Sequence, residues 1–229
     1  IELNVAIRSL AAIPSYFVDG GTFSVDPDVS MYRLLLLVSY ALNSLLGGNH
    51  AAGYHAVNVL LHAIFVVLVF LLGLRLTGRQ MPMWWAAAIL AVHQLNSQAV
   101  NYVSSRSGLL AAIGALGAFY LSSLVSRPRP LMVGMSQLAG LLAKYTAFAG
   151  VGLTSLYEYG RSGSHRIPSL VALALASALY VGGAWASGFY GTAFHDVIRP
   201  LTTQTLTQFK ALAYYLYLWA SPVHLSICP

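Results

Sequence analysis

Two basic side chains, Arg106 and Lys144, lie within or beside apolar stretches of the sequence, where a charge is costly. Arg106 has serines on both sides, and Lys144 interrupts an apolar run with no acid near it in sequence. A guanidinium binds phosphate through two parallel hydrogen bonds, and a lone intramembrane lysine needs a partner, a phosphate or a water-filled cavity. The two cations therefore predict a phosphate site. For Arg106, a snorkelling side chain that anchors its helix is the alternative.

A second set of polar side chains falls in the same apolar stretches: His55, Asn58, His62, His93 and Gln98. The first three are spaced i, i+3 and i+7, so they share one face of a helix. Hydrogen bonding between helices, at about 0.6–2 kcal/mol per bond, is the interpretation that we favour. Ligation of a pigment or haem by a single histidine stays open. His55 and His62 are two turns apart, about 10 Å, which is too far for one ion, and we expect no metal site here.

The composition shows what must position these groups. Of the 229 residues, 58% are hydrophobic and 8% are charged, whereas a soluble domain carries about 25% charged residues. The solvent around most of the chain is therefore lipid, and spanning segments must be helices or a closed barrel. Long apolar runs without a period of two favour helices. The pattern predicts an all-α membrane protein.

About six or seven transmembrane helices are expected. Apolar stretches cover 34–46, 54–76, 84–103, 109–125, 131–159, 168–187 and 206–219. The stretch 131–159 is interrupted at Lys144 and forms either one long helix or a broken pair. We divide the chain into an extended outer-face segment at 1–32 and a transmembrane helical domain at 33–229.

The charges orient this arrangement. Residues 1–30 hold four of the six acids, and short basic loops follow three of the helices. Arginines favour the cytoplasmic side. If 131–159 crosses twice, the clusters at 75–79, 127–129 and 161–166 share that side, and the acidic segment is outside. No signal-peptide pattern precedes it, and we expect the natural protein to begin upstream of Ile1.

Some classes of function are disfavoured by the charge and the cysteine count. The net charge of +6 is explained by cytoplasmic loops, and we expect no nucleic-acid partner. The single cysteine, Cys228, cannot form an intrachain disulfide. We expect an integral membrane protein.

The order of short motifs resembles a known family. The matching elements are Ile7-Arg8-Ser9-Leu10, Met31-Tyr32-Arg33, Gly53-Tyr54-His55 with Asn58 and His62, Ala91-Val92-His93 with Arg106, Leu142-Ala143-Lys144, and Leu206-Thr207-Gln208. Together they resemble the membrane domain of bacterial glycosyltransferases that carry tetratricopeptide repeats. Those enzymes are similar to the eukaryotic transmembrane O-mannosyltransferases with such repeats. The resemblance implies a location in the bacterial inner (cytoplasmic) membrane.

The resemblance implies a GT-C-like bundle that transfers sugar from a polyprenyl-phosphate donor on the outer face, to a protein hydroxyl or another acceptor. It implies that Arg106 and Lys144 hold the donor phosphate, and that Tyr32 and Arg33 belong to an outer loop. A divalent metal is compatible with this chemistry. Transfer needs a base, normally a carboxylate, and cations that offset the phosphate charge. Asp19 is the best remaining base within the chain, although its Asp-Gly-Gly context is typical of a turn.

Four positions that are commonly acidic in the family are neutral here: Gln98, Gly108, Tyr145 and Cys228. Two functions therefore remain. The first is a lipid-linked-sugar-dependent glycosyltransferase, which the motif order and the retained cations favour. The second is a catalytically degenerate homologue, a pseudoenzyme that serves as a structural or interaction subunit of a larger membrane complex. The neutral positions favour this second function.

Overall fold

The structure is a computed structural model that describes residues 12–18, 31–48, 50–124, 129–160, 166–189 and 200–220. All regular structure within these ranges is helical, which confirms the expected all-α class. The helices are α1 (Ser15–Val18), α2 (Leu34–Gly47), α3 (Ala51–Thr77), α4 (Gln80–Val92), α5 (Ser97–Asn101), α6 (Arg106–Ser123), α7 (Pro130–Ala143), α8 (Phe148–Gly160), α9 (Arg166–Ala186) and α11 (Leu201–Ala220).

Two helices in the described ranges, α3 and α9, are long and apolar enough to cross a membrane. At about 1.5 Å per residue they extend about 40 and 31 Å, compared with about 30 Å for the hydrocarbon core of a bilayer. The helices α2, α4 and α7 are also apolar but shorter. The bundle of six or seven membrane helices therefore stays a prediction.

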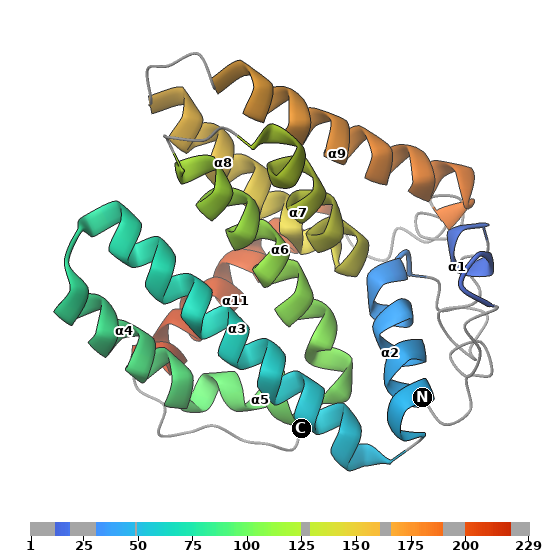
Figure 1. The fold of residues 1–229 in the computed structure, drawn as a ribbon, viewed down its shortest axis with the longest axis horizontal. Coiled ribbons are helices and arrows are strands. Elements are labelled where there is room, and N and C mark those ends of the chain that lie inside the picture. The colour runs from blue at the N-terminus through green and yellow to red at the C-terminus, as the bar shows by residue number, and fades with distance from the viewer. Residues whose placement is uncertain are drawn as a thin grey trace.

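The stretch 131–159 forms two helices, as the broken-pair alternative predicted. Helix α7 ends at Ala143, and α8 begins at Phe148 after a 3₁₀ turn at Tyr145–Ala147. Lys144 lies between them in an extended conformation, with φ −164° and ψ 136°. The chain reverses there, so α6, α7, α8 and α9 run side by side in alternating directions (Figure 1).

Glycines allow the two most closely packed helices to approach each other. A Cβ atom added at Gly114 of α6 would lie 2.5 Å from the backbone of Gly140 on α7. Small residues at a crossing let helix backbones come close, which strengthens van der Waals contact where no hydrophobic effect operates between helices. The α6–α7 pair is thus the centre of the bundle.

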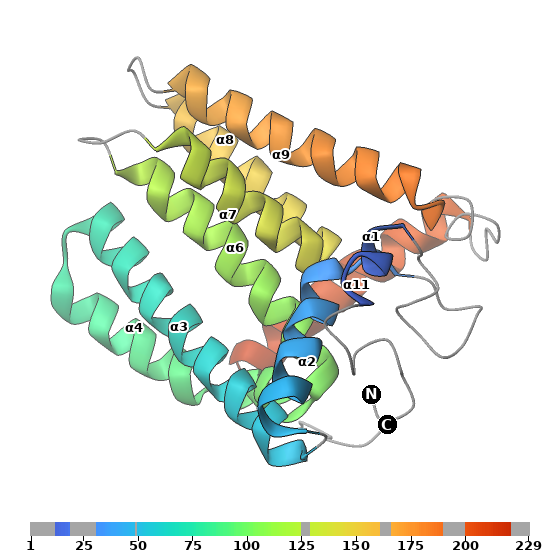
Figure 2. The ribbon, with the colours of Figure 1, turned by 45° about the vertical axis from the view of Figure 1, so that its right-hand side comes forward.

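The two ends of the bundle differ. At one end, which we call the arginine end, α3, α6 and α8 finish and α4, α7 and α9 begin (Figure 2). Arg75 donates there to the Ser123 carbonyl from Nε and Nη2, at 3.3 and 3.2 Å. The other end, which we call the cavity end, contains the α7–α8 reversal and the start of α6. Its buried core includes Leu37, Tyr40, Leu141 and Tyr180.

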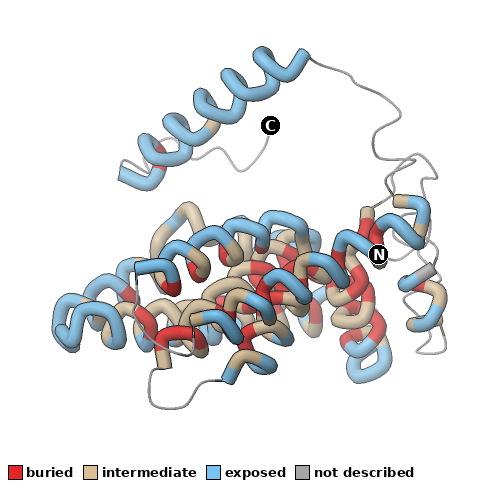
Figure 3. The backbone as a smooth tube through the Cα atoms, turned by 90° about the horizontal axis from the view of Figure 1, so that it is seen from above, coloured by how far each residue is buried: buried red, intermediate tan, exposed pale blue. Residues whose placement is uncertain are grey.

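Large apolar side chains cover much of the outer surface. Figure 3 shows exposed residues along the outer faces of the bundle and along nearly all of α11. Trp85 of α4, Leu156 of α8 and Trp185 of α9 are 66%, 72% and 76% exposed. An apolar surface of this extent is typical of a protein that contacts lipid or another protein. Within α11, only Leu218 is buried.

Candidate functional site

Arg106, the first residue of α6, is fully buried and links three helices. Its Nε donates to Asn58 Oδ1 at 2.9 Å, and its Nη2 donates to Asn43 Oδ1 at 2.9 Å and to the Tyr54 carbonyl at 3.0 Å. Nη1 donates to the carbonyl and hydroxyl of Ser39, at 3.3 and 3.5 Å. All five N–H groups of the guanidinium are therefore used within the protein.

Aromatic rings and a second amide complete this Arg106 network. The Arg106 guanidinium carbon lies 5.0 Å from the Tyr40 ring centre and 5.4 Å from the Tyr54 ring centre. Asn58 also donates to the carbonyls of Val100 and Tyr102, at 3.3 and 3.1 Å. The network thereby fixes the irregular segment that leads into α6. That segment forms one wall of the adjacent cavity.

The cavity lies at the cavity end of the bundle and has a volume of about 540 Å³. Arg33, which precedes α2, and Lys144 both line it. The other polar lining residues are Asn96, Gln98, Ser104, Ser105 and Ser107. Apolar lining is supplied by Phe65, Leu95 and Leu109. Arg33 Nη1 donates to the Ser107 hydroxyl at 3.5 Å. We call this site the cation cavity.

Electrostatics favour an anion in the cation cavity. Burial and the neighbouring positive charge of Arg33 lower the pKa of Lys144 below its ordinary value. Two cations that share a partly desolvated space repel each other, and a bound anion removes that repulsion. No hydrogen bond from the Lys144 ammonium to a described residue is observed. Its three donors are therefore available to a ligand as far as the described residues show.

The structure separates the two cations that the sequence paired. Lys144 lines the cation cavity, whereas Arg106 lies behind its wall, inside the network. In this conformation Arg106 has no N–H group left for a phosphate. Arg33, which the sequence placed only in an outer loop, is the second cation beside Lys144.

The polar residues that the sequence analysis identified within the apolar stretches do not form one cluster; they make separate contacts. Asn58 belongs to the Arg106 network, and Gln98 lines the cation cavity. His62 Nε2 contacts the Ala91 carbonyl at 3.2 Å, which joins α3 to the end of α4. His93 Nε2 contacts the Trp219 carbonyl at 3.1 Å, and its Nδ1 accepts from the Leu95 amide. His55 is half-buried. The interhelical hydrogen bonding that we favoured is observed for Asn58 and His62.

Two further predicted residues belong to the amino-terminal segment. Tyr32 is buried, with its ring centre 5.6 Å from that of Tyr180 on α9. Asp19, the candidate base, lies outside the described residues. Among the described residues, no three His, Cys, Asp or Glu side chains gather into a group that could hold a metal ion.

Two neutral residues at commonly acidic family positions line the cation cavity, namely Gln98 and Gly108. A third, Tyr145, follows Lys144 directly and is 61% exposed. The fourth, Cys228, lies outside the described residues. Two of the four neutral positions thus line the cavity that holds the cations, and its described lining contains no carboxylate.

Sequence reasoning missed several polar residues that the structure uses. Ser39 and Asn43 on α2 bind Arg106. The sequence signal that could have found them is the presence of two polar residues within the short apolar stretch 34–46. Glu158 is also buried, and it accepts a hydrogen bond from Ser122 near the arginine end. A lone acid within an apolar stretch is the signal that marks it.

These observations define a class of protein: an all-helical, apolar chain with a cavity that two cations line at one end of its bundle. The chain is similar to protein O-mannosyl-transferases. It is 33% identical to Tmtc1 of Drosophila melanogaster over 144 residues, which is 59% of this chain and 17% of that protein. It is 29% identical to TMTC3 of Mus musculus over 163 residues, which is 68% of this chain and 18% of that protein.

A third relative, the protein O-mannosyl-transferase Tmtc2 of Drosophila melanogaster, is 32% identical over 147 residues, covering 59% of this chain and 16% of that protein. The chain therefore spans less than a fifth of the length of these curated relatives. No protein-family model matches the chain. No solved structure matches it significantly.

Proposed function

We propose that the protein is an integral membrane glycosyltransferase that uses a polyprenyl-phosphate-linked sugar on the outer face of the membrane. The observation that carries this proposal is the cation cavity, which Arg33 and Lys144 both line and where a phosphate would meet two positive charges. Similarity to protein O-mannosyl-transferases supports transfer of a hexose to a protein hydroxyl. The bacterial inner membrane is the location expected from the sequence, and it stays part of the proposal.

Each part of the cation cavity has its own proposed role in sugar transfer. Arg33 and Lys144 offset the charge of the phosphate as it leaves, which is the main electrostatic requirement of such a transfer. The serine-lined wall positions the donor, and the Arg106 network holds that wall in place. Asp19 stays the proposed base. The six or seven helices of a GT-C-like bundle, with residues 1–32 outside, complete this arrangement.

The test is sugar transfer by the purified full-length protein in nanodiscs, with polyprenyl-phosphate mannose and a serine- and threonine-rich peptide. We expect Lys144→Gln and Arg33→Gln to lose transfer, since each removes a charge from the phosphate site. Arg129→Gln, at the arginine end, is the matched control and keeps it. Equal activity in all three variants contradicts the phosphate role.

The second candidate function is a catalytically degenerate subunit of a larger membrane complex. The neutral lining of the cation cavity at Gln98 and Gly108 favours it. In that case the wild-type protein transfers no sugar and co-purifies with stoichiometric protein partners. Gln98→Glu and Asp19→Asn separate the two candidates. Loss of transfer on Asp19→Asn supports the enzyme, whereas transfer that arises only with Gln98→Glu supports a degenerate site.

A further inference from the structure

Tyr180 of α9 touches both of the chain segments that carry the cations of the cation cavity. Its ring centre lies 5.6 Å from that of Tyr32, the residue before Arg33, in an edge-to-face contact. It also lies 5.7 Å from the ring centre of Phe148, with the two ring planes at 76°. Phe148 begins α8 and follows Lys144 by four residues. One buried side chain, 4% exposed, therefore joins two segments that are far apart in the chain.

A glycine one turn along α9 completes the contact with Tyr32. Tyr180 and Gly183 are three positions apart, so they lie on one face of the helix. A Cβ atom added at Gly183 would overlap the Tyr32 hydroxyl oxygen, and an alanine at this position must displace the tyrosine. Tyr32 is thus held against α9, together with the backbone that leads into Arg33.

Neither cation lies within a helix, so regular helix geometry alone places neither of them. Arg33 precedes α2 with φ −134° and ψ 59°, and Lys144 follows α7 in an extended conformation. Gln137 Nε2 donates to the Ala147 carbonyl at 2.7 Å, which fixes the turn after Lys144 to α7. Packing of α2 on α7 brings the two cations to one end of the bundle. The contacts of Tyr180 then fix the two irregular segments that carry them.

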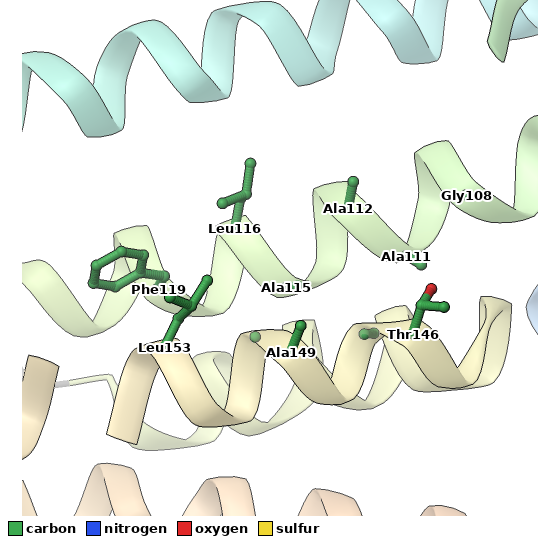
Figure 4. A pocket seen from close by; sticks show the side chains of 11 residues that line it. Gly108, Ala111, Ala112, Ala115, Leu116, Phe119, Thr146, Ala149 and Leu153 are labelled. Carbon is green, nitrogen blue, oxygen red and sulfur yellow. The ribbon is translucent and has the colours of Figure 1, made fainter. Parts of the chain in front are cut away.

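A hollow of about 310 Å³ lies beside the turn that follows Lys144, between α6 and α8 (Figure 4). Thr146 and Ala149 line it from the side of α8. The residues opposite them on α6 are small: Gly108, Ala111, Ala112 and Ala115. Because the turn adjoins open space on this side, its position depends more strongly on the aromatic contact with α9.

We propose that Tyr180 is a positioning residue that sets the spacing of Arg33 and Lys144 and thereby prepares the cation cavity for an anion. Long cationic side chains bind an anion well when their backbones are already in place, since ordering each side chain on binding costs affinity. This inference rests on the phosphate role proposed above for the two cations. It adds a residue on a third segment of the chain that acts through them.

The experiment measures binding of inorganic pyrophosphate to the full-length protein in detergent micelles, by isothermal titration. Tyr180→Ala removes the ring, Tyr180→Phe keeps it, and Gly183→Ala displaces Tyr32 while Tyr180 stays. Gly182→Ala is the matched control, because its added Cβ atom would meet nothing within 4 Å. Lys144→Gln reports whether the cation itself binds the anion. Thermal denaturation shows that each variant is folded.

We expect Tyr180→Ala and Gly183→Ala each to weaken pyrophosphate binding by about tenfold, which is the cost of ordering the two long cationic side chains on binding. Tyr180→Phe and Gly182→Ala should bind pyrophosphate like the wild type. In a Lys144→Gln background, the further change Tyr180→Ala should cause little additional loss, because the remaining cation has no partner at a set spacing. A general loss of stability would instead give additive losses.

Wild-type affinity in both Tyr180→Ala and Gly183→Ala overturns the inference. An equal loss from Tyr180→Ala with and without Lys144→Gln overturns it too. If Lys144→Gln alone still loses pyrophosphate binding in those cases, the phosphate role stands and only the positioning role fails. Unchanged binding in Lys144→Gln removes the phosphate role itself, and the positioning role with it.

Discussion

At the scale of single residues, Arg106 and Lys144 have opposite environments although both are cations at the same end of the bundle. Arg106 is fully buried, and each of its N–H groups has an acceptor in the protein. Lys144 lines a cavity beside a second cation, Arg33. The first environment supports a structural role for Arg106, and the second supports the phosphate-binding role that we propose for Lys144.

Replacing Arg106 with lysine tests this division. Lysine is a single point charge and cannot bind Asn43, Asn58 and Ser39 in a fork. Their buried acceptors lose their donors, and we expect the free energy of unfolding to fall by about 3 kcal/mol. Thermal denaturation in detergent measures this loss. Lys144→Gln is the comparison, because it should keep the fold and lose phosphate binding.

The pH dependence of phosphate binding tests the pairing of Arg33 with Lys144. Because the pKa of Lys144 is lowered, its charge and the affinity for pyrophosphate should be lost at a lower alkaline pH than for an ordinary lysine. Arg33→Gln removes one cause of the lowered pKa. We therefore expect the weaker pyrophosphate binding that remains in Arg33→Gln to be lost at a higher pH than in the wild type, as measured by titration calorimetry at several pH values.

The same shift affects stability with a definite sign. Between the lowered folded-state pKa and the ordinary value of 10.5, the unfolded chain binds more protons at Lys144 than the folded protein does. Stability should therefore rise with pH across that window. Lys144→Met should abolish the rise. Buried tyrosines with a raised pKa contribute in the opposite direction, so the test is the difference between the two profiles. A difference between wild type and Lys144→Met that falls with pH in that window contradicts the assignment.

Arg106 and Lys144 could both be singled out from the sequence, since a charge beside an apolar run is visible without a structure. The surroundings of the two side chains could not be predicted from the sequence. Ser39 and Asn43 lie more than sixty positions from Arg106 in the chain, and only the docking of α2 on α6 brings them together. Arg33 was assigned to a loop because sequence spacing does not show that this loop reaches Lys144.

At the scale of the helices, the close approach of α6 and α7 depends on glycine. Gly114→Ala places a Cβ atom 2.5 Å from the backbone of Gly140, so the helices must separate. We expect a loss of about 1–3 kcal/mol, as for other overpacked interfaces. Gly152→Ala on α8 is the control, because its added Cβ atom meets nothing within 4 Å.

Denaturation of both variants in the same detergent gives the comparison. Gly152→Ala should be neutral or more stable, since alanine favours a helix over glycine by up to about 1 kcal/mol. If the two variants behave alike, the glycine contact does not determine the packing of α6 on α7.

The helices themselves were largely predictable, and their interruptions were less so. Apolar length located α3, α6 and α9, and the polar interruption at Lys144 located the break between α7 and α8. The stretch 84–103 instead divides after Val92 into short turns and α5. These turns are held by Asn58 from α3, and a local pattern carries no signal for a distant donor.

At the scale of the whole molecule, the arginine end and the cavity end are opposite each other. The sequence predicted that the basic clusters share one side if 131–159 crosses twice. The structure shows two antiparallel helices there, α7 and α8, and their crossing of a membrane stays a prediction. The orientation of these ends in a membrane is still a prediction, because it depends on the positive-inside tendency of short loops.

Single cysteines in a Cys228→Ser background test the orientation. We expect Gln80→Cys and Arg129→Cys, at the arginine end, to resist a membrane-impermeant maleimide added to intact cells. Ser104→Cys and Tyr145→Cys, at the cavity end, should react. Labelling after permeabilisation controls for accessibility. Reaction of all four in intact cells contradicts the proposed topology.

The Arg106 network has a consequence for the order of biosynthesis. Its acceptors on α2 and α3 are synthesised before Arg106 leaves the ribosome, since Asn58 precedes it by forty-eight positions. Until α6 arrives, the amides of Asn43 and Asn58 lack their charged donor, and in the proposed membrane setting lipid would supply no substitute. Helices α2 and α3 therefore cannot dock as a finished pair before α6 is present. A nascent chain halted before Arg106 should stay loosely assembled and be open to proteolysis.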